Sequence, residues 1–418
     1  MQSRAAQAQA IWMAVAAAAL LLGVTLGSRS SLGLFLAPIN SATAVGLAAL
    51  SLAIGLGQLA WGAAQPLVSA AAARLGTARV VAAGGVASAA GLVAIALSRD
   101  ASTVTASVLF FGAAGAAAGS APILMGAVAQ RVPEARRGIA LGIVSAGGSA
   151  GQLVLAPVAA GLIVFAGWQA ALLALALIAL AAAPLARCLR GASTAVATPP
   201  PGAARRDIVA ALRSPGFWSI AAAFGVCGFH VSFLTTHMPN VIALCGLPPD
   251  LSGTWLALTG ACNIAGSLGA GWLSQRMSMA RLLTAIYALR AAGVALFLLL
   301  PPSTSVMLGF ALWMGLSYMA TVPPTSGLIA RQFGVHSLAA LFGVAMAVHQ
   351  LGSFLGATLG GLEVQFTGGY HWVWIADMLL ACTAAALHLP LRDRATAATG
   401  DVPPRSAPAP AGLARDTR

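Results

Sequence analysis

The chain has 418 residues, of which 59% are apolar and 7% are charged, and its formal net charge is +13. A soluble domain is about 45–50% apolar and about 25% charged, so this composition excludes soluble globular, secreted, fibrous and disordered proteins. All 22 basic residues are arginines. Such an excess would suggest nucleic-acid binding in a soluble protein, whereas in a membrane protein it arises in the cytoplasmic loops.

Apolar runs of about 20 residues, long enough to cross a bilayer, recur along the chain. The first six lie at 10–37, 45–72, 78–98, 102–129, 138–164 and 168–187. The next six lie at 215–243, 252–275, 281–300, 304–330, 338–363 and 371–390. The first run continues without a small-residue cleavage site, so it is read as a span and not as a signal peptide. Backbone groups in hydrocarbon need partners within their own segment, and none of the runs alternates as a strand would. We predict an all-α membrane protein with twelve transmembrane helices in two six-helix bundles.

Residues 189–214 interrupt this pattern. A proline-rich stretch at 198–202 is followed by Arg205, Arg206 and a short amphipathic piece that we expect at the membrane surface. The predicted units are an N-terminal bundle at 1–190, a cytoplasmic linker at 191–213, a C-terminal bundle at 214–392 and a disordered tail at 393–418.

The arginines predict the topology. With the N-terminus inside, 19 of the 22 lie on inner segments, and the exceptions are Arg99 in an outer loop and Arg29 and Arg290 inside helices. Because cytoplasmic loops carry the excess of basic residues, we expect both termini in the cytoplasm, with the protein in an inner (plasma) membrane. No basic stretch is interleaved with aromatic residues, so no nucleic-acid partner is expected.

The second half of the chain repeats features of the first at an offset of about 201–202 residues. The matched pairs are Arg74 with Arg276, Arg79 with Arg281, Gly142 with Gly343, Gly151 with Gly352, and Gly167 with Gly368. Because the first half crosses the membrane six times, an even number, the second half starts on the same side of the membrane as the first. Such parallel repeats are related by an axis along the membrane normal, and they place a substrate site near the midplane between two rocking halves.

The loop between the second and third spans resembles the signature of the Major Facilitator Superfamily, in which a Gly is followed by Asp-Arg-x-Gly-Arg. Arg74, Gly76 and Arg79 match this signature, whereas its Gly and Asp are replaced by Ser69 and Ala73. A basic stretch that includes Arg137 resembles the entry to the family's fifth helix. The resemblance covers nearly the whole chain. It implies a transporter whose gating loop includes Arg74, Gly76, Arg79 and Arg137.

Within that superfamily, the chain is similar to bacterial members grouped with monocarboxylate and oxalate/formate carriers. The segments that carry this similarity are 27–36, 228–239, 263–266, 287–290, 321–324, 349–354 and 367–370. The Asp…Arg pair that eukaryotic monocarboxylate carriers have in the eighth helix is replaced here by Asn263 and Ser267. The similarity implies a small organic anion as substrate. The eighth-helix motif gives no support for monocarboxylate specificity, because its charged pair is replaced.

Two arginines inside the apolar spans are candidates for function, because charged side chains in hydrocarbon are costly. Arg29 lies well inside the first span, where it could hold a substrate carboxylate through a bidentate pair. The alternative is that Arg29 snorkels to the outer headgroups or caps a helix end. Arg290 lies near the middle of the ninth span, and either a substrate role or a structural pair with Asp377 is open.

Further candidates lie on helices that line the cavity in the family. His230 and His237 are two helical turns apart and share a face, and either could carry a proton or donate to an anion. His349 and Gln350 lie mid-way along the eleventh span, and Asn263 could be a ligand or an interhelical hydrogen bond. The candidate substrate-binding residues are Arg29, His230, His237, Asn263, Arg290, His349 and Gln350.

The predicted function is secondary transport of a small organic anion of the monocarboxylate type, with protons as a candidate coupling ion. The alternative is a proton-coupled multidrug or metabolite exporter, which would need a buried carboxylate in the cavity and often an arginine in the fourth helix. The fourth span has neither. The sequence has no clustered carboxylates, no metal-ligand spacing and no Walker loop, so we expect no enzyme activity, cofactor or metal. We also expect the protein to be a monomer.

Overall fold

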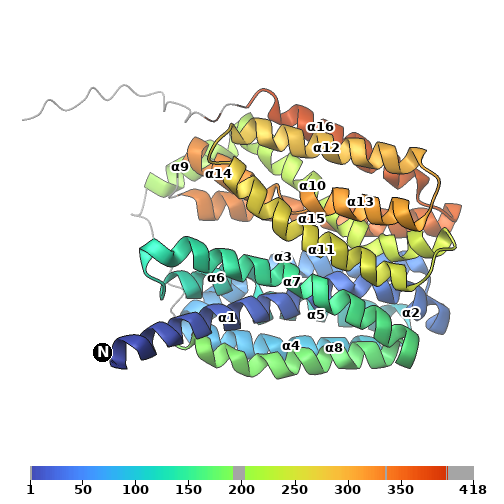
Figure 1. Cartoon of the computed structure of the whole chain (residues 1–418), viewed down its shortest axis with the longest axis horizontal. Helices are drawn as coiled ribbons and strands as arrows, with labels where there is room; N and C mark the ends of the chain where they lie inside the picture. Colours follow the sequence, from blue (N-terminus) through green and yellow to red (C-terminus); the bar gives the residue numbers. More distant parts are fainter. Residues whose placement is uncertain (1, 192–202, 335–336, 392, 394–418) are drawn as a thin grey trace, which may run out of the picture.

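The computed structural model describes residues 2–191, 203–334, 337–391 and 393, and every element in these ranges is helical. Most of the predicted tail and residues 192–202 of the predicted linker lie outside the described residues. The two bundles lie side by side, with the N-terminal half below and the C-terminal half above in Figure 1.

The N-terminal bundle begins with a span built from three consecutive helices and contains further breaks in its fourth and sixth spans. Its elements are α1 (Gln2–Ser30), η1 (Ser31–Phe35), α2 (Leu36–Thr43), α3 (Leu47–Leu75), α4 (Thr77–Leu97), α5 (Ala101–Gly119), α6 (Ala121–Ala129), α7 (Glu134–Ala166), α8 (Trp168–Ala182) and η2 (Ala183–Leu189).

The C-terminal bundle follows a short helix, α9 (Ala203–Leu212), that packs against it. Its tenth span is broken like the fourth, with proline in the first turn of the second piece in both cases. The elements are α10 (Pro215–Leu244), α11 (Asp250–Leu273), α12 (Met279–Leu299), α13 (Thr304–Ser317), α14 (Val322–Phe333), α15 (Leu338–Thr367) and α16 (His371–His388).

Eleven helical segments of the described residues are long and apolar enough to cross a membrane, and they match the first eleven predicted spans closely. The twelfth, α16, is 18 residues long and is less apolar than the other spans, because it contains Asp377 and has a histidine at each end. It packs against α12 and α10 within the C-terminal bundle. The all-helical fold of two six-helix bundles is confirmed.

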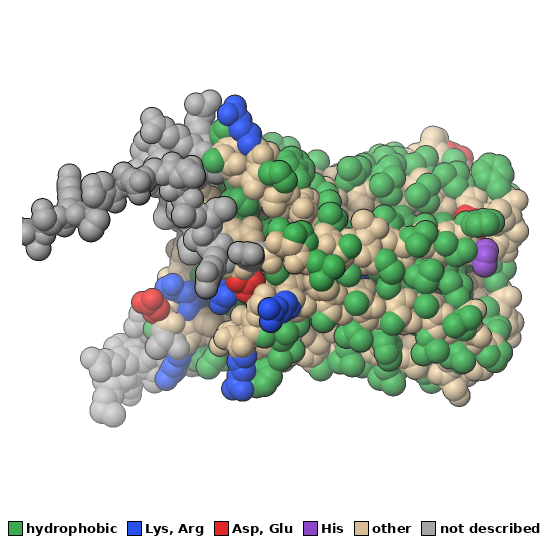
Figure 2. Space-filling view, turned by 90° about the horizontal axis from the view of Figure 1, so that it is seen from above, with side chains coloured by type: hydrophobic (Ala, Val, Ile, Leu, Met, Phe, Trp, Pro, Cys, Tyr) green, Lys and Arg blue, Asp and Glu red, His purple; other side chains and the backbone are tan. Residues whose placement is uncertain are grey.

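The outer surface is apolar along the sides, and its basic side chains gather at one end (Figure 2). We call this the basic end; it contains Arg74, Arg79, Arg131, Arg137, Arg276 and Arg281. The opposite, far end contains Asp100, Asp250 and Glu363. The N-terminus lies at the basic end (Figure 1), and Asp393 reaches the same end, where its carboxylate accepts from the backbone N–H of Met279 at 2.7 Å.

The internal repeat reappears as a repeated helix packing. In the N-terminal bundle, a Cβ at Gly151 of α7 would overlap the carbonyl oxygen of Gly23 in α1. In the C-terminal bundle, a Cβ at Gly352 of α15 would overlap the carbonyl oxygen of Gly225 in α10. Both pairs have the offset seen in the sequence, so the two bundles use the same glycine contact to bring their first and fifth spans together.

Buried apolar side chains of the described residues form one large core toward the far end and two large cores toward the basic end, with a small fourth cluster around Leu282. The far core joins both bundles and includes Leu155 of α7 and Trp255 of α11. Nearer the basic end, a core around Val144 in the N-terminal bundle is separate from a core around Leu328 in the C-terminal bundle. The bundles are therefore packed together at the far end and divided toward the basic end.

Contacts between the bundles follow the same division. Ala48 of α3 donates to Gln365 of α15 at 2.9 Å near the far end, and Gln152 of α7 donates to the Leu256 carbonyl of α11 at 3.3 Å. Nearer the basic end, a Cβ added at three glycines of the facing helices would meet open space: Gly142, Gly269 and Gly343. The two hydrogen bonds from Ala48 and Gln152 both lie in the far half of the helices that make them.

The glycine contact yields a test of the fold. Replacing Gly151 with Leu should lower the free energy of unfolding by about 1–3 kcal/mol, because the side chain has to displace the α1 backbone. Replacing Gly142 with Leu, in the same helix but facing open space, should leave it nearly unchanged. Thermal unfolding of both variants in detergent measures the difference, and equal midpoints would contradict this packing.

Candidate functional site

Arg29 lies near the middle of the first span, in the last turn of α1. The chain tightens there into η1, where Gly33 allows the backbone of α10 to approach closely. The half-buried guanidinium lies 4.2 Å from the ring centre of Trp61 in its own bundle. On the other side it is within electrostatic range of Tyr318 of the C-terminal bundle. The described part of the chain offers no carboxylate as an ion-pair partner for Arg29.

Arg290 of α12 is buried and donates hydrogen bonds to the backbone at the break between α13 and α14. Its Nη2 donates to the carbonyl oxygens of Ser317 and Tyr318, the latter at 2.6 Å. Asn263 of α11 contributes from another side, because its Oδ1 accepts from the backbone N–H of Met319 at 3.0 Å. Arg290 and Asn263 thus supply hydrogen-bond partners to backbone groups that the helix break leaves without intrahelical bonds.

Asp377 is not paired directly with Arg290, which was the structural alternative considered for that arginine. Its Oδ2 lies 2.6 Å from Nδ1 of His230 in α10, and both side chains are almost completely buried. Arg290 remains within electrostatic range of Asp377. The structure therefore separates the two histidines that the sequence groups on one face, since His230 belongs to this buried pair between α10 and α16.

His237 belongs to a different polar group, nearer the far end. Its Nε2 lies 2.7 Å from the carbonyl oxygen of Ala357, and its Nδ1 lies 3.2 Å from the hydroxyl of Tyr370. That hydroxyl also accepts from Asn240 at 2.8 Å. Burial raises the pKa of the Tyr370 phenol above its usual range, so the phenol stays neutral. All the polar atoms of His237 have partners within the C-terminal bundle.

The other predicted candidates lie where the bundles meet. Gln350 of α15 donates to the carbonyl oxygen of Gln58 in α3 at 3.0 Å. Asn263 donates to the hydroxyl of Ser149 in α7 at 2.9 Å. The neighbouring His349 is buried, its Nδ1 lies 3.2 Å from the side-chain oxygen of Gln350, and its ring packs on Phe224. Arg29, Asn263 and Gln350 are thus brought to the bundle interface, whereas Arg290, His230 and His237 lie inside the C-terminal bundle.

The predicted gating residues gather at the basic end. Gly76 joins α3 to α4 with a φ of +90°, a conformation that favours glycine. Arg79 lies one turn into α4, with Nη1 3.5 Å from the carbonyl oxygen of Leu75 in the last turn of α3. Arg74 and Arg137 are exposed.

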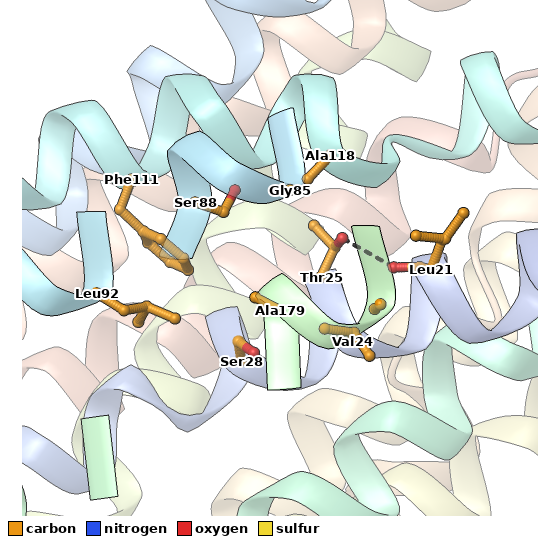
Figure 3. Close-up of a pocket in the computed structure, with 11 residues that line it drawn as sticks. Leu21, Val24, Thr25, Ser28, Gly85, Ser88, Leu92, Phe111, Ala118 and Ala179 are labelled. Carbon is orange, nitrogen blue, oxygen red and sulfur yellow. Dashed lines mark hydrogen bonds between the residues drawn. The ribbon is translucent and has the colours of Figure 1, made fainter. Parts of the chain in front are cut away.

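A small cavity lies inside the N-terminal bundle beside α1 and is too small for an organic ligand. Its volume is about 20 Å³, which is room for one water molecule. The hydroxyls of Ser28 and Ser88 line it (Figure 3), and both are buried without a protein partner. A single bound water would satisfy them, so this cavity is not a substrate site.

Sequence reasoning missed Trp61 and Tyr318, the aromatic neighbours of Arg29. Aromatic residues are common in membrane helices, and neither stands out by spacing. Tyr318 directly precedes the proline-marked break at 321–324, and this is the signal that could have found it. Cys227 of α10 has its Sγ 3.2 Å from the hydroxyl of Thr321 at the same break.

The capping role of Arg290 can be tested against Arg29. Replacing Arg290 with Met should lower the free energy of unfolding by at least about 1–3 kcal/mol, because buried carbonyls lose their donor. Replacing Arg29 with Met should have a smaller effect, since no described carboxylate pairs with it. Thermal unfolding midpoints compare the two variants. A larger loss for Arg29→Met would contradict the assignment.

A sequence profile of the Major Facilitator Superfamily matches residues 18–357 and 246–415. The chain is 28% identical over 273 residues to an uncharacterized MFS-type transporter of Bacillus subtilis, a match covering 61% of this chain and 64% of that relative. It is 24% identical over 386 residues to monocarboxylate transporter 13 of Rattus norvegicus, covering 91% of this chain and 89% of the relative. Monocarboxylate transporter 11 of Mus musculus is 28% identical over 385 residues, with 86% and 82% covered.

The fold is also similar to a solved transporter structure. A bacterial homolog of the human lysosomal transporter Spinster, in an inward-facing and occupied conformation, superposes with a TM-score of 0.73 at 14% identity. The match covers 90% of this chain and 95% of that chain. A profile match over most of the length, with two helical bundles of matching fold, identifies the chain as a multi-pass membrane transporter. The chain belongs to the Major Facilitator Superfamily.

Proposed function

We propose that the protein is a secondary transporter of a small organic anion of the monocarboxylate type, moved by alternating access and coupled to protons. The observation that carries this proposal is Arg29, a cation near the middle of its span that lies within electrostatic range of Tyr318 of the other bundle and has no described carboxylate partner. A cation held in hydrocarbon without a protein counter-ion is suited to a substrate anion. Relatives named monocarboxylate transporters support the substrate class.

The surroundings of Arg29 suit a carboxylate attached to a small organic group. The planar guanidinium offers paired N–H donors that match the two oxygens of a carboxylate. Trp61 stacks on Arg29 and limits its orientations, and Tyr318 supplies a phenol from the opposite bundle. A substrate held between Arg29 and Tyr318 would contact both bundles. Movement of the bundles would then transfer it from one side to the other.

The distribution of arginines supports an orientation with the basic end in the cytoplasm of a bacterial cell and the protein in its inner membrane. Both described chain ends lie at that end. In this orientation the division between the bundles faces inward, and the packed far ends close the outer side. We propose a monomer as the working unit.

The exporter alternative has weaker support. Such a mechanism needs a carboxylate that the substrate can reach, and Asp377, the one carboxylate that is fully buried among the described residues, is paired with His230 inside the C-terminal bundle. The organic anion therefore remains our proposal.

We further propose that Arg74, Gly76, Arg79 and Arg137 act in gating at the basic end and not in binding. The tight turn at Gly76 holds α3 and α4 in a fixed relation while α3 moves against α15. The N-terminal bundle would then swing as one body.

Replacing Arg29 with Gln should abolish uptake and leave the protein folded. Loss of a charge-assisted pair costs about 1.5–3 kcal/mol, which corresponds to a roughly tenfold or greater loss of affinity. The assay is uptake of radiolabelled acetate, pyruvate, lactate and benzoate by proteoliposomes. The same four compounds are compared by thermal shift, because binding to the folded state raises its stability.

The matched control is Arg99→Gln, which removes the same charge from an exposed site at the far end. It should transport like the wild type. Unchanged uptake by Arg29→Gln would refute the role of Arg29. Absence of both binding and uptake of all four compounds by the wild type would refute the monocarboxylate class.

Replacing Gly76 with Ala should slow transport and leave the affinity for substrate unchanged, because the positive φ costs a side chain about 1–3 kcal/mol and loosens the turn. The control is Gly126→Ala in α6, where the added methyl group would meet open space. Initial uptake rates at several substrate concentrations separate rate from affinity. A change in affinity alone would argue against a gating role.

A further inference from the structure

We propose that the His230–Asp377 pair is the site that binds the coupling proton, apart from the substrate site at Arg29. This inference deepens the proposed function and rests on it. It assigns the proton to the interior of the C-terminal bundle and the anion to the interface between the bundles. The sequence leaves open whether His230 or His237 carries a proton or donates to an anion; the pairing of His230 with Asp377 comes from the structure.

The geometry of the pair supports proton binding. Nδ1 of His230 and Oδ2 of Asp377 are 2.6 Å apart, and the side chains are 1% and 0% exposed. The other polar atom of each, His230 Nε2 and Asp377 Oδ1, is buried without a hydrogen-bond partner in the described part of the chain. Each such unpaired buried group is costly, and Nε and Nη1 of Arg290 are also without a partner in the described part of the chain. A site that gains and loses a proton needs such free atoms in one of its states.

The charges around the pair are nearly balanced. Arg290 of α12 is within electrostatic range of Asp377, and a guanidinium keeps its positive charge in proteins. The other buried titratable side chains on the helices packed against α10 and α16 are Cys227 and His237 of α10, Tyr287 of α12, Tyr318 at the α13–α14 break, His349 of α15 and His388 of α16. None of these is a carboxylate, and Glu363 of α15 lies at the far end, where it accepts from the backbone of α16. One carboxylate thus faces one fixed positive charge, and a proton on the pair leaves the cluster with a charge of +1.

Polar groups connect this pair to the substrate site. Arg290 donates to the carbonyl of Tyr318, and Tyr318 lies within electrostatic range of both Arg290 and Arg29. Cys227, one turn before His230, lies beside Thr321 at the same break. A change of charge at Asp377 therefore acts on the break that presents Tyr318 to Arg29. This gives the proton and the anion a physical means of influencing each other.

The proton balance is simple. A hydronium ion transfers one proton to the His230–Asp377 pair and becomes a water molecule, and on the other side the pair returns the proton to a water molecule, which becomes hydronium. An anion of charge −1 carried with this proton makes the overall step electroneutral. Uptake should rise as the external pH falls, because protonation of the pair is favoured at low pH.

Proton binding can be measured without a substrate. Infrared difference spectra of the purified protein, recorded between about pH 5 and about pH 8, report protonated carboxyl and imidazolium groups. We expect a protonation signal in the wild type that is missing in Asp377→Asn. Glu363→Gln makes the same chemical change in α15, where the carboxylate accepts from the backbone of α16, and should retain the signal. A wild-type spectrum without any band sensitive to Asp377→Asn would overturn the proposal.

Transport tests the coupling. Asp377→Asn should lose accumulation driven by an inside-alkaline pH gradient and retain exchange of the same radiolabelled compounds across the membrane without a gradient. Gradient-driven accumulation equal to the wild type would overturn the coupling role. Should Asp377→Asn fail to fold, His230→Gln, which keeps the carboxylate, is measured in both assays with the same criteria. Failure of the wild type to take up any of the four monocarboxylates, with the infrared signal intact, would refute the proposed substrate class and not the proton site.

Discussion

Backbone groups in the hydrocarbon interior have to find partners inside the protein, and the break between α13 and α14 is where this constraint shapes the molecule most. Ser317 and Tyr318 expose carbonyls there, and Arg290 donates to both. Asn263 accepts from the next backbone N–H. Two of the polar residues that the sequence marks as candidate ligands are therefore engaged in holding a break. That break brings Tyr318 into the range of Arg29.

The same arrangement separates two tasks. Arg29 lies at the interface with an aromatic residue from each bundle nearby, and its charge has no described counter-ion. Inside the C-terminal bundle, Arg290 is balanced by Asp377, which His230 contacts directly. One arginine thus lacks a described carboxylate partner, whereas the other lies near the buried His230–Asp377 pair. Both lie within apolar spans, and the difference depends on their neighbours.

The repeat gives the two bundles similar internal packing and lets them differ in chemistry. Glycine contacts bring α1 to α7 and α10 to α15 at corresponding positions. The bundles share one core toward the far end and have separate cores toward the basic end. Rigid bundles with a shared far core and a divided basic end are suited to rocking motion. The buried carboxylate and both α10 histidines belong to the C-terminal bundle alone.

The sequence by itself determined the helical class, the positions of the spans and the concentration of arginines at one end. Hydropathy and charge are local properties of a segment, and they decide directly which segments enter the bilayer and which loops stay inside. It also singled out Arg29, Arg290 and His230, since ionisable side chains in apolar runs are few. Only the tertiary structure decided their partners. Asp377 and His230 are 147 positions apart, Trp61 stacks on Arg29 from another helix, and Tyr318 comes within electrostatic range of Arg29 from the other bundle. Helix periodicity describes which residues share a face, but the rotation and tilt of each helix depend on packing against its neighbours, and these decide which charges meet.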